Sequence, residues 1–344
     1  MSSVQLQVVP SSTLEGELAS VLRALGFSAR QTGALTARLG WDGRGGTTLA
    51  RAALPSGYSR ERVRQLEDRL HSLAADRGAH LTKPILEAAL ATAHALTPET
   101  RGQLAEELWT RGLAAYPFDA YGLVQAERIF ALEPRLGLEA DLVVRDQTTA
   151  VLPRLRRAAR VAAQDRGAVS LLEVAVALGF DVPRARRLLG QLPDLEWLDR
   201  KQTWAALAVP NVVRRSETIL AKLFALTPRL PLRDVEEGLR RSFRPVIVPQ
   251  AIVVELCRRI DWLEFNEYRR TFVATTRPDP EKALSPVERE LVTLFAPSEP
   301  FSHAVAVDRG LRRQLNRNTI AGYLLHSPIF RAVDHGRFML RGGA

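Results

Sequence analysis

The feature that most constrains the fold is an internal repeat in the second half of the sequence. Three successive segments each contain three helical patterns of apolar residues followed by two short strand-like stretches. The first aromatic residue of each strand-like pair is Trp197, Trp262 or Phe330, which gives spacings of 65 and 68 residues. A repeat of this length predicts a string of small modules.

Each copy has the layout of a winged helix, in which the third helix presents side chains to a partner and a two-stranded ribbon forms the wing. The ribbons are predicted at "EWLD" to "TWAALAV", "DWLEFN" to "RTFVAT" and "IFRAV" to "RFMLR". We expect their aromatic residues to fill the small cores, and stacking on nucleic-acid bases is the alternative. These aromatic residues are Trp197, Trp204, Trp262, Phe272, Phe330 and Phe338.

Apolar periodicity predicts helices in most of the remaining sequence, with Gly, Pro or Asp at the breaks. The predicted fold is therefore mainly α, with a helix-turn-helix domain followed by tandem winged-helix modules with short β-hairpin wings. The predicted boundaries are a helix-turn-helix domain at 1–78, a helical acidic spacer or degenerate winged helix at 79–150, and winged helices at 151–212, 213–280 and 281–344.

The formal net charge of the 344 residues is +10, which favours a polyanionic partner because clustered cations release the counterions condensed on phosphate. Only four of the 48 basic residues are lysine, so a GC-rich genome is an alternative explanation for the arginine content. The charge lies in blocks: residues 151–215 carry +6 and residues 301–344 carry +5, whereas residues 76–150 carry −4. This uneven distribution is better evidence for a polyanionic partner than the total charge.

The sequence contains none of the common motifs for catalysis. A phosphate-binding glycine loop, a nucleophile elbow, a His-Glu-x-x-His pair and a dinucleotide-binding glycine pattern are all absent, so we expect no enzyme. One cysteine and six scattered histidines give no basis for a disulfide or a metal site, and no cofactor is expected. Without a long apolar run or a secretion signal, we expect a cytoplasmic protein associated with the nucleoid.

A second informative stretch, residues 38–73, reads "RLGWDGRGGTTLARAALPSGYSRERVRQLEDRLHSL". Its glycine cluster breaks the preceding helix, and Thr48 is expected to cap a short helix from Leu49 to about Leu54. Gly57 makes the turn into Ser59, which is expected to cap a longer helix. This order predicts helix-turn-helix geometry, in which the first turns of the second helix enter the major groove of DNA.

The longer helix has two different faces. Its apolar stripe, predicted to be buried, consists of Val63, Leu66, Leu70 and Leu73. The polar residues on the other side, near the helix start, are Arg60, Glu61, Arg64 and Gln65. Such side chains can read bases, because guanidinium pairs with guanine, a carboxylate accepts from cytosine and a carboxamide pairs with adenine.

Residues 38–73, about a tenth of the chain, resemble region 4 of the sigma-70 family of transcription initiation factors. The match consists of Thr48-Leu49 and the uninterrupted run Gly57-Tyr58-Ser59-Arg60-Glu61-Arg62-Val63-Arg64-Gln65-Leu66-Glu67. In that family the second helix reads the minus-35 promoter element. The resemblance implies base reading by Arg60, Glu61 and Gln65, with phosphate or base contacts by Arg62 and Arg64. Thr48 and Ser59, at the two helix starts, complete the candidate residues of this domain.

Two departures from the family pattern limit what the resemblance implies. Ala50-Arg51 stand where acidic residues are usual, and Pro55-Ser56 stand where a buried leucine is usual, so we expect an altered turn. The sequence also lacks a counterpart of region 2, the aromatic-rich segment with which such factors bind polymerase and melt the promoter. A stand-alone initiation factor is therefore not expected.

The three repeats, mainly through "SPIFRAVDHGRFML", resemble winged-helix modules of the HARE type, which occur in a polymerase accessory subunit and beside sigma-like helix-turn-helix domains. Among the third helices, the start of "NRNTIAGYL" suits base reading, and "PRARRLL" suits phosphate contacts. The candidate residues are Asn316, Arg317, Asn318, Thr319, Arg184, Arg186 and Arg187. "PQAIVVELCRRI" is apolar at its start and is expected to pack against protein.

The function expected from these patterns is a sequence-specific double-stranded DNA-binding regulator of bacterial transcription. The alternative is an interaction scaffold, associated with polymerase or with a defence system, that has general affinity for DNA. The expected partners are double-stranded DNA and, through the winged-helix repeats, RNA polymerase or another protein.

Overall fold

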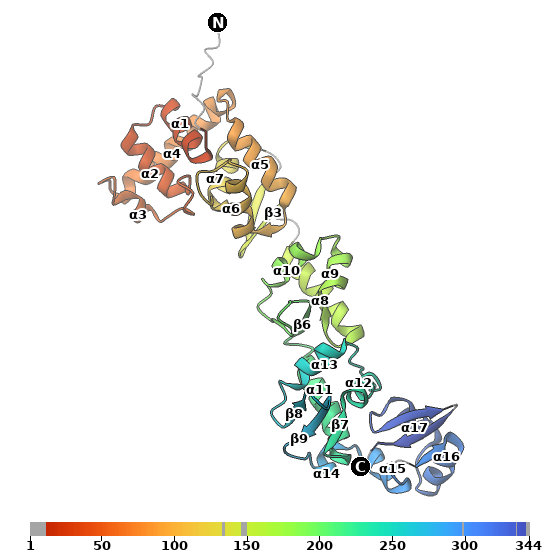
Figure 1. The fold of residues 1–344 in the computed structure, drawn as a ribbon. Helices are drawn as coiled ribbons and strands as arrows, with labels where there is room; N and C mark the ends of the chain where they lie inside the picture. Colours follow the sequence, from red (N-terminus) through yellow and green to blue (C-terminus); the bar gives the residue numbers. More distant parts are fainter. Residues whose placement is uncertain (1–11, 133–134, 146–149, 298, 335, 342–344) are drawn as a thin grey trace. The chain divides into compact units, whose positions relative to one another are not determined.

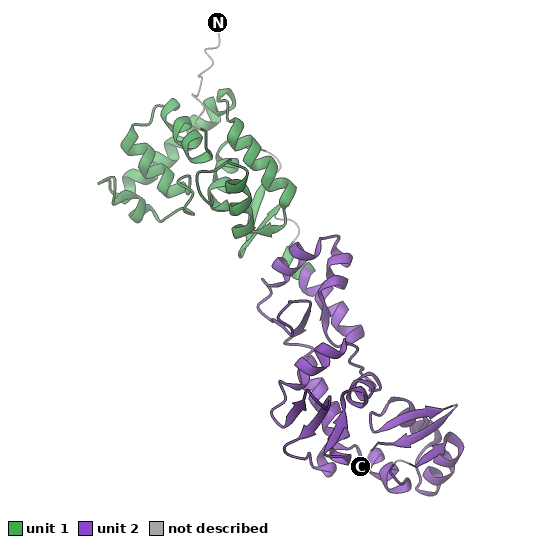
Figure 2. Ribbon diagram, in the orientation of Figure 1, with its two compact units in different colours: residues 1–154 green, residues 155–344 purple. Residues whose placement is uncertain are grey.

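The computed structural model describes residues 12–132, 135–145, 150–297, 299–334 and 336–341. The fold is mainly α: within these residues, seventeen α-helices are joined by small antiparallel sheets of three strands each (Figure 1). The chain divides into two compact units, residues 1–154 and residues 155–344 (Figure 2).

The first half of unit 1 consists of four helices, α1 (Leu14–Ala24), α2 (Ala29–Leu39), α3 (Leu49–Ala53) and α4 (Arg60–Arg77), followed by a 3-10 turn at Gly78–His80. Each of the four helices begins at a residue whose side-chain oxygen accepts a hydrogen bond from the backbone of the first turn. These capping residues are Thr13, Ser28, Thr48 and Ser59. The predicted caps Thr48 and Ser59 are therefore confirmed.

The second half of unit 1 contains three helices and a sheet. The elements are α5 (Pro84–Leu96), β1 (Glu99–Thr100), α6 (Arg101–Thr110), α7 (Ala120–Ile129), β2 (Leu136–Glu139) and β3 (Leu142–Arg145). The strand order in the sheet is β1-β3-β2, with Glu99 opposite Val143 and Leu136 opposite Arg145. This stretch lies within residues 79–150, for which the sequence predicted either a helical acidic spacer or a degenerate winged helix.

One apolar core runs through both halves of unit 1. Leu18 and Leu22 of α1 belong to the same buried cluster as Leu70 of α4 and Leu123 of α7. Burying a leucine side chain contributes about 1.5–3 kcal/mol, so a shared core of this size makes the two halves one folding unit. In unit 1 the four N-terminal helices are therefore held by the helices and sheet that follow them.

The three predicted repeats follow as successive modules that, apart from the first four residues of the first helix, lie in unit 2. The first is α8 (Val151–Arg166), β4 (Val169–Ser170), α9 (Leu171–Leu178), α10 (Val182–Leu189), β5 (Leu195–Trp197) and β6 (Trp204–Leu207). The second is α11 (Val212–Leu226), β7 (Arg229–Pro231), α12 (Leu232–Arg240), α13 (Gln250–Cys257), β8 (Leu263–Asn266) and β9 (Thr271–Ala274). The third is α14 (Pro280–Ala283), α15 (Pro286–Leu294), β10 (Pro300–Ser302), α16 (His303–Arg312), α17 (Arg317–His326), β11 (Phe330–Asp334) and β12 (Arg337–Leu340).

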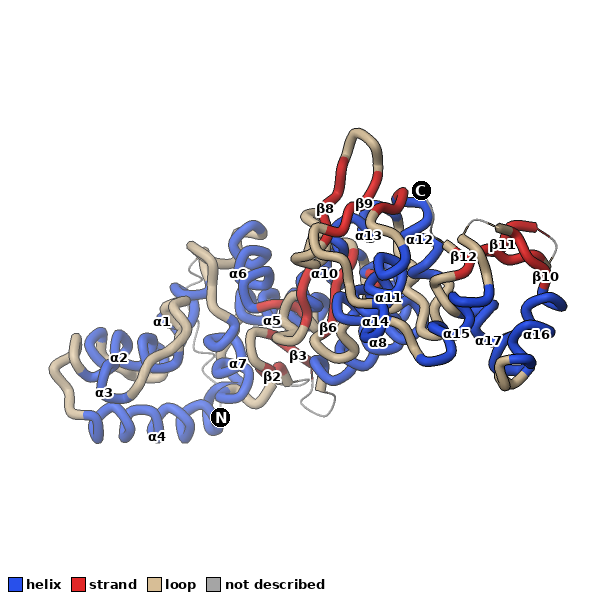
Figure 3. Tube along the Cα trace, turned by 90° about the horizontal axis from the view of Figure 1, so that it is seen from below, coloured by secondary structure: helices blue, strands red, loops and turns tan. Residues whose placement is uncertain are grey.

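Each sheet of unit 2 places its third strand between the first and the second, with orders β4-β6-β5, β7-β9-β8 and β10-β12-β11. The strands are drawn in red in Figure 3. The predicted ribbons are confirmed as β5–β6, β8–β9 and β11–β12. Of the ribbon aromatics, Phe272, Phe330 and Phe338 are buried. Trp197, Trp204 and Trp262 are partly buried.

Neighbouring modules of unit 2 are joined by polar contacts as well as by apolar packing. Arg259, after α13, donates hydrogen bonds to the carbonyl oxygens of Trp197 and Leu198 at 3.0 and 3.3 Å. Lys222 of α11 forms an ion pair of 2.8 Å with Glu288 of α15. The Glu288 carboxylate is fully buried and also accepts from Ser327 at 2.6 Å, so it links the second module to the third.

Candidate nucleic-acid interface

The α3–α4 pair packs through small side chains. Ala34 of α2, Ala52 and Ala53 of α3, and Val63 of α4 form a separate buried cluster. Because these side chains are short, the three helices approach closely and the short α3 is fixed against α4. The two helices and the turn between them lie at the end of unit 1 where α3 is labelled in Figure 1.

The turn between α3 and α4 buries a polar residue. Leu54 is 78% exposed, whereas Ser56 is buried and its Oγ donates to the Ala53 carbonyl at 2.9 Å. Arg30 of α2 donates from Nε to the Ser56 carbonyl, and its guanidinium lies 4.7 Å from the ring centroid of Tyr58. Hydrogen bonds and one cation–π contact therefore hold this turn.

Gly57 is required in the same turn. Its φ of +60° is disfavoured for residues with a Cβ, and a Cβ there would lie 2.6 Å from Nη2 of Arg30. The turn therefore depends on a glycine that both adopts the left-handed conformation and leaves room for Arg30.

The outer face of α4 carries the predicted base-reading residues. Val63, Leu66 and Leu70 are buried, as predicted, and Leu73 is partly buried. The exposed residues on the outer face are Arg60, Glu61, Arg62, Arg64 and Gln65, with Thr48 and Ser59 exposed at the two helix starts. The structure therefore brings all seven candidates of this domain to the solvent side of one short helix, turn and longer helix.

Several of these side chains contact each other. Arg64 pairs with Glu61 at 2.7 Å and with Asp68 at 3.1 Å, and Arg62 donates to Gln65 Oε1 at 3.2 Å. The hydrogen bond from Arg64 holds the pKa of Glu61 below its ordinary value, so Glu61 is an ionised acceptor at neutral pH. Exposed ion pairs of this kind contribute little to stability, and their members can exchange partners when a ligand arrives.

The inner side of α4 is anchored at two points. Arg38 of α2 bonds Glu67 at 3.0 Å and donates to the Thr47 carbonyl, also at 3.0 Å, so it fixes the loop that precedes α3. Arg69 lies with its guanidinium 5.2 Å from the ring centroid of Phe27. These contacts, together with the buried stripe, set the orientation of the outer face.

The glycine-rich loop between α2 and α3 rests on α7, which sequence reasoning missed. The backbone N–H of Asp119 donates to the Gly43 carbonyl at 3.0 Å, and the Asp119 side chain pairs with Arg101 at 2.7 Å. A Cβ on Gly122 of α7 would lie 2.4 Å from the carbonyl oxygen of Gly40, and one on Gly46 would meet the Tyr121 ring at 2.4 Å. The sequence contains both partners, the glycine cluster and the stretch "YPFDAYG" with Asp119 and Tyr121, but no local pattern connects them.

Helix α7 itself is largely buried by its packing within unit 1. Most residues of α7 are buried, including Gly122, Val124 and Ala126. Phe118, just before the helix, is fully buried as well. α7 therefore serves as a support for the helices before it and presents little surface to a separate partner.

The candidates in unit 2 lie in two different modules. Arg184, Arg186 and Arg187 of α10 are partly buried, and Arg184 lies over the ring of Phe180 at 4.7 Å. In the last module Asn316 caps α17 by accepting from the Asn318 backbone at 2.8 Å. Asn316, Arg317 and Asn318 are exposed and Thr319 is partly buried.

The third helix of the middle module has a buried side. Ile252, Val253, Leu256 and Cys257 of α13 belong to the core that also contains Leu198 and Ala206 of the preceding module. Burial raises the pKa of the Cys257 thiol to about 12, so this cysteine is an unreactive core residue. The inner side of α13 therefore packs within the chain's own core, and the predicted contact of its start with another protein stays a prediction.

Within the described residues, no group of three or more His, Cys, Asp or Glu side chains is placed to hold a metal ion. No helix in the described part of the chain has the length and apolar character needed to cross a bilayer. Protein-family models and curated proteins give no match to the sequence.

Proposed function

We propose that this protein is a sequence-specific double-stranded DNA-binding regulator of transcription, with α3, the turn and α4 acting as a helix-turn-helix of the sigma region 4 type. The observation that carries this proposal is the outer face of α4. Its first two turns expose Arg60, Glu61, Arg64 and Gln65, while its other face is fixed by Val63, Leu66, Arg38 and Arg69.

The chemistry of this face suits the major groove. Arg60 can donate two hydrogen bonds to guanine, Gln65 can pair with adenine, and the ionised Glu61 can accept from cytosine N4. Arg62 and Arg64 can hold phosphates once they leave Gln65 and Glu61. Both helices begin with capped N-termini, whose positive dipole ends favour phosphate nearby.

The other modules support a larger footprint. In each, three helices and three strands alternate in the order helix, strand, helix, helix, strand, strand, with the third strand in the middle of the sheet. This topology fits the winged helix, so we assign tandem winged helices to residues 84–145, 151–207, 212–274 and 286–340. α17, with its exposed Asn316, Arg317 and Asn318, is the best placed of their third helices to read bases, and α10 can hold phosphates.

Selection of bound duplexes from a random pool tests the proposal. The wild type should select a defined motif, and Arg60→Ala combined with Gln65→Ala should relax it at particular base pairs, because each base contact supplies about 1–3 kcal/mol of discrimination. Arg77→Ala is the matched control, since Arg77 is exposed at the opposite end of α4. An identical motif from the double variant and the wild type would refute base reading by α4.

A scaffold that binds protein is the second candidate, and one observation favours it. Leu172 and Val176 on α9 are 62% and 74% exposed, one helical turn apart on the same face. Exposed apolar pairs of this kind are typical of protein contact sites. DNA binding with a steep salt dependence and no selected motif would favour this function over the first.

A further inference from the structure

A groove in unit 2 carries positive charge that no neighbouring carboxylate in its lining balances. It has a volume of about 560 Å³ and lies between the linker before α11, the outer face of α11 and the loop after α12. Four of its described lining residues are basic and none is acidic: the basic residues are Arg214, Arg215, Lys222 and Arg244. Lys222 pairs with Glu288, which leaves three arginines.

Two of these arginines repel each other. Within the described residues, the guanidinium groups of Arg215 and Arg244 make no hydrogen bond or ion pair. Burial lowers the pKa of Arg215, and the nearby charge of Arg244 lowers it further. Two uncompensated guanidinium groups facing one groove form an unfavourable arrangement that a bound anion would relieve.

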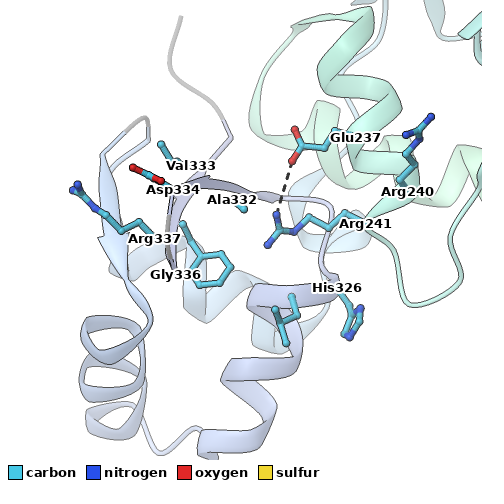
Figure 4. A pocket seen from close by; sticks show the side chains of 11 residues that line it. Glu237, Arg240, Arg241, His326, Ala332, Val333, Asp334, Gly336 and Arg337 are labelled. Atoms are coloured by element: carbon cyan, nitrogen blue, oxygen red, sulfur yellow. Dashed lines mark ion pairs between the residues drawn. The ribbon is translucent and has the colours of Figure 1, made fainter.

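A second groove in the same unit has carboxylates among its cations and serves as a comparison. Its lining contains Arg240, Arg241 and Arg337 together with the carboxylates of Glu237 and Asp334 (Figure 4). There Arg241 lies 3.9 Å from Glu237, and the same Glu237 pairs with Arg341 at 2.9 Å. The cations of that groove share its lining with carboxylates, whereas the described lining around Arg215 contains none.

The rest of the cationic groove is apolar and partly aromatic. Phe243 and Val209 are 60% and 72% exposed and lie in its lining. The Phe243 ring packs against Tyr323 and His326, with ring centroids 5.7 and 5.1 Å away, so it forms a fixed platform. An aromatic platform beside unpaired arginines suits a ligand with a planar ring and an anionic group.

The start of α11 adds to the positive potential. Asn211 caps this helix of 15 residues and lies in the groove lining, so the positive end of the helix dipole faces the same space as the arginines. The volume of the groove is within the usual range of small-molecule sites. We propose that this groove binds a phosphorylated small molecule with a planar ring, of the size of a mononucleotide.

Isothermal titration of the full chain with ATP, GTP and AMP tests this site without relying on DNA recognition by α4. At least one nucleotide should bind with a micromolar dissociation constant. Adenosine and inorganic phosphate should each bind at least tenfold more weakly, because adenosine lacks the anionic group and inorganic phosphate lacks the planar ring. A failure of all three nucleotides to bind the wild type would overturn the proposal, whatever the outcome of the duplex selection.

Two pairs of variants locate the site. Arg215→Ala with Arg244→Ala should weaken nucleotide binding at least tenfold, whereas Arg229→Ala with Arg233→Ala, which removes the same charge from exposed positions of the same module, should not. Arg244→Glu alone changes only an exposed side chain and should also weaken binding, so the test does not depend on the folding of the Arg215 variant. Equal affinities in both double variants would overturn the site. Loss of duplex DNA affinity with unchanged nucleotide binding would assign the groove to DNA phosphate instead.

Discussion

Glu17 shows how a single residue joins the two halves of unit 1. It lies buried in α1, and its carboxylate accepts hydrogen bonds from the backbone N–H groups of Ile85 and Leu86 at 3.1 and 2.7 Å, at the start of α5. Lys83, also buried, donates from Nζ to the carbonyl oxygens of Gly78 and Leu81. Buried charges persist only with such partners, so these two residues tie α1, the end of α4 and the start of α5 together.

The pKa of Glu17 makes this link dependent on pH. Burial raises the pKa above 4.5, and the two backbone hydrogen bonds offset only part of that rise. Because the folded-state pKa is the higher one, the stabilisation from this group is complete below pH 4.5 and is lost as the pH rises through the folded-state value.

We expect Glu17→Gln to lower the free energy of unfolding by about 1–3 kcal/mol, because the new amide N–H₂ has no acceptor in the buried site. The deficit relative to the wild type should grow as the pH falls from 7 toward 4.5, since only the wild type can take up the proton. Urea denaturation at several pH values measures both effects. A deficit that stays constant with pH would contradict the assignment of this titration to Glu17.

At the scale of the element, close contact with α7 holds the glycine-rich loop that leads into α3. The carbonyl oxygen of Gly40 and the Cα of Gly122 approach so closely that only glycine fits on α7. Asp119 caps α7 and also receives Arg101, so one carboxylate fixes both the helix start and the loop beside it.

Gly122→Ala should therefore destabilise unit 1 by about 1–3 kcal/mol, the usual cost of overpacking. Gly102→Ala on α6 is the matched control: a Cβ there meets nothing within 4 Å, so the change should stabilise the protein by about 0.5–1 kcal/mol. Thermal unfolding of both variants gives the comparison. Equal shifts in the same direction would show that the α7 contact does not constrain the fold.

The elements also show which parts of the structure the sequence could predict. Ser59, Val63, Leu66 and Leu70 give a capped amphipathic helix by local rules alone, and that prediction is confirmed. The ribbons after each third helix were visible as pairs of short stretches with aromatic residues. Local pattern was sufficient wherever the stabilising contacts lie within one element or one hairpin.

Other features depended on contacts between distant residues. The first strand of each sheet has only two or three residues, too few for a periodic signal, and exists because it pairs with the third strand about 30–45 residues later along the chain. The role of Arg30 in the turn likewise requires that α2 pass beside Ser56, which no local pattern contains. The groove around Arg215 and Arg244 arises from a helix and a loop about 30 residues apart, so no local pattern indicates it.

At the scale of the whole molecule, four modules share one order of helices and strands, and the first of them follows helices α1–α4 in unit 1. In the module of unit 1 the third helix, α7, is largely buried. In the middle module of unit 2 the third helix, α13, is partly buried in a core shared with the module before it. In α10 and α17, the third helices of the first and last modules of unit 2, arginine or asparagine side chains stand at or near the helix start. The third helices of the modules therefore differ in role: α7 and α13 pack within the chain, whereas α10 and α17 are candidates for DNA contact.

The central claim is that α4 reads bases in the major groove. The most direct test is methylation interference with dimethyl sulfate on a selected duplex, because this reagent modifies guanine N7 in the major groove and adenine N3 in the minor groove. We expect methylation of one particular guanine to prevent binding of the wild type and to leave binding of the Arg60→Ala variant unchanged. Interference confined to adenines, or the same guanine pattern in both proteins, would contradict it.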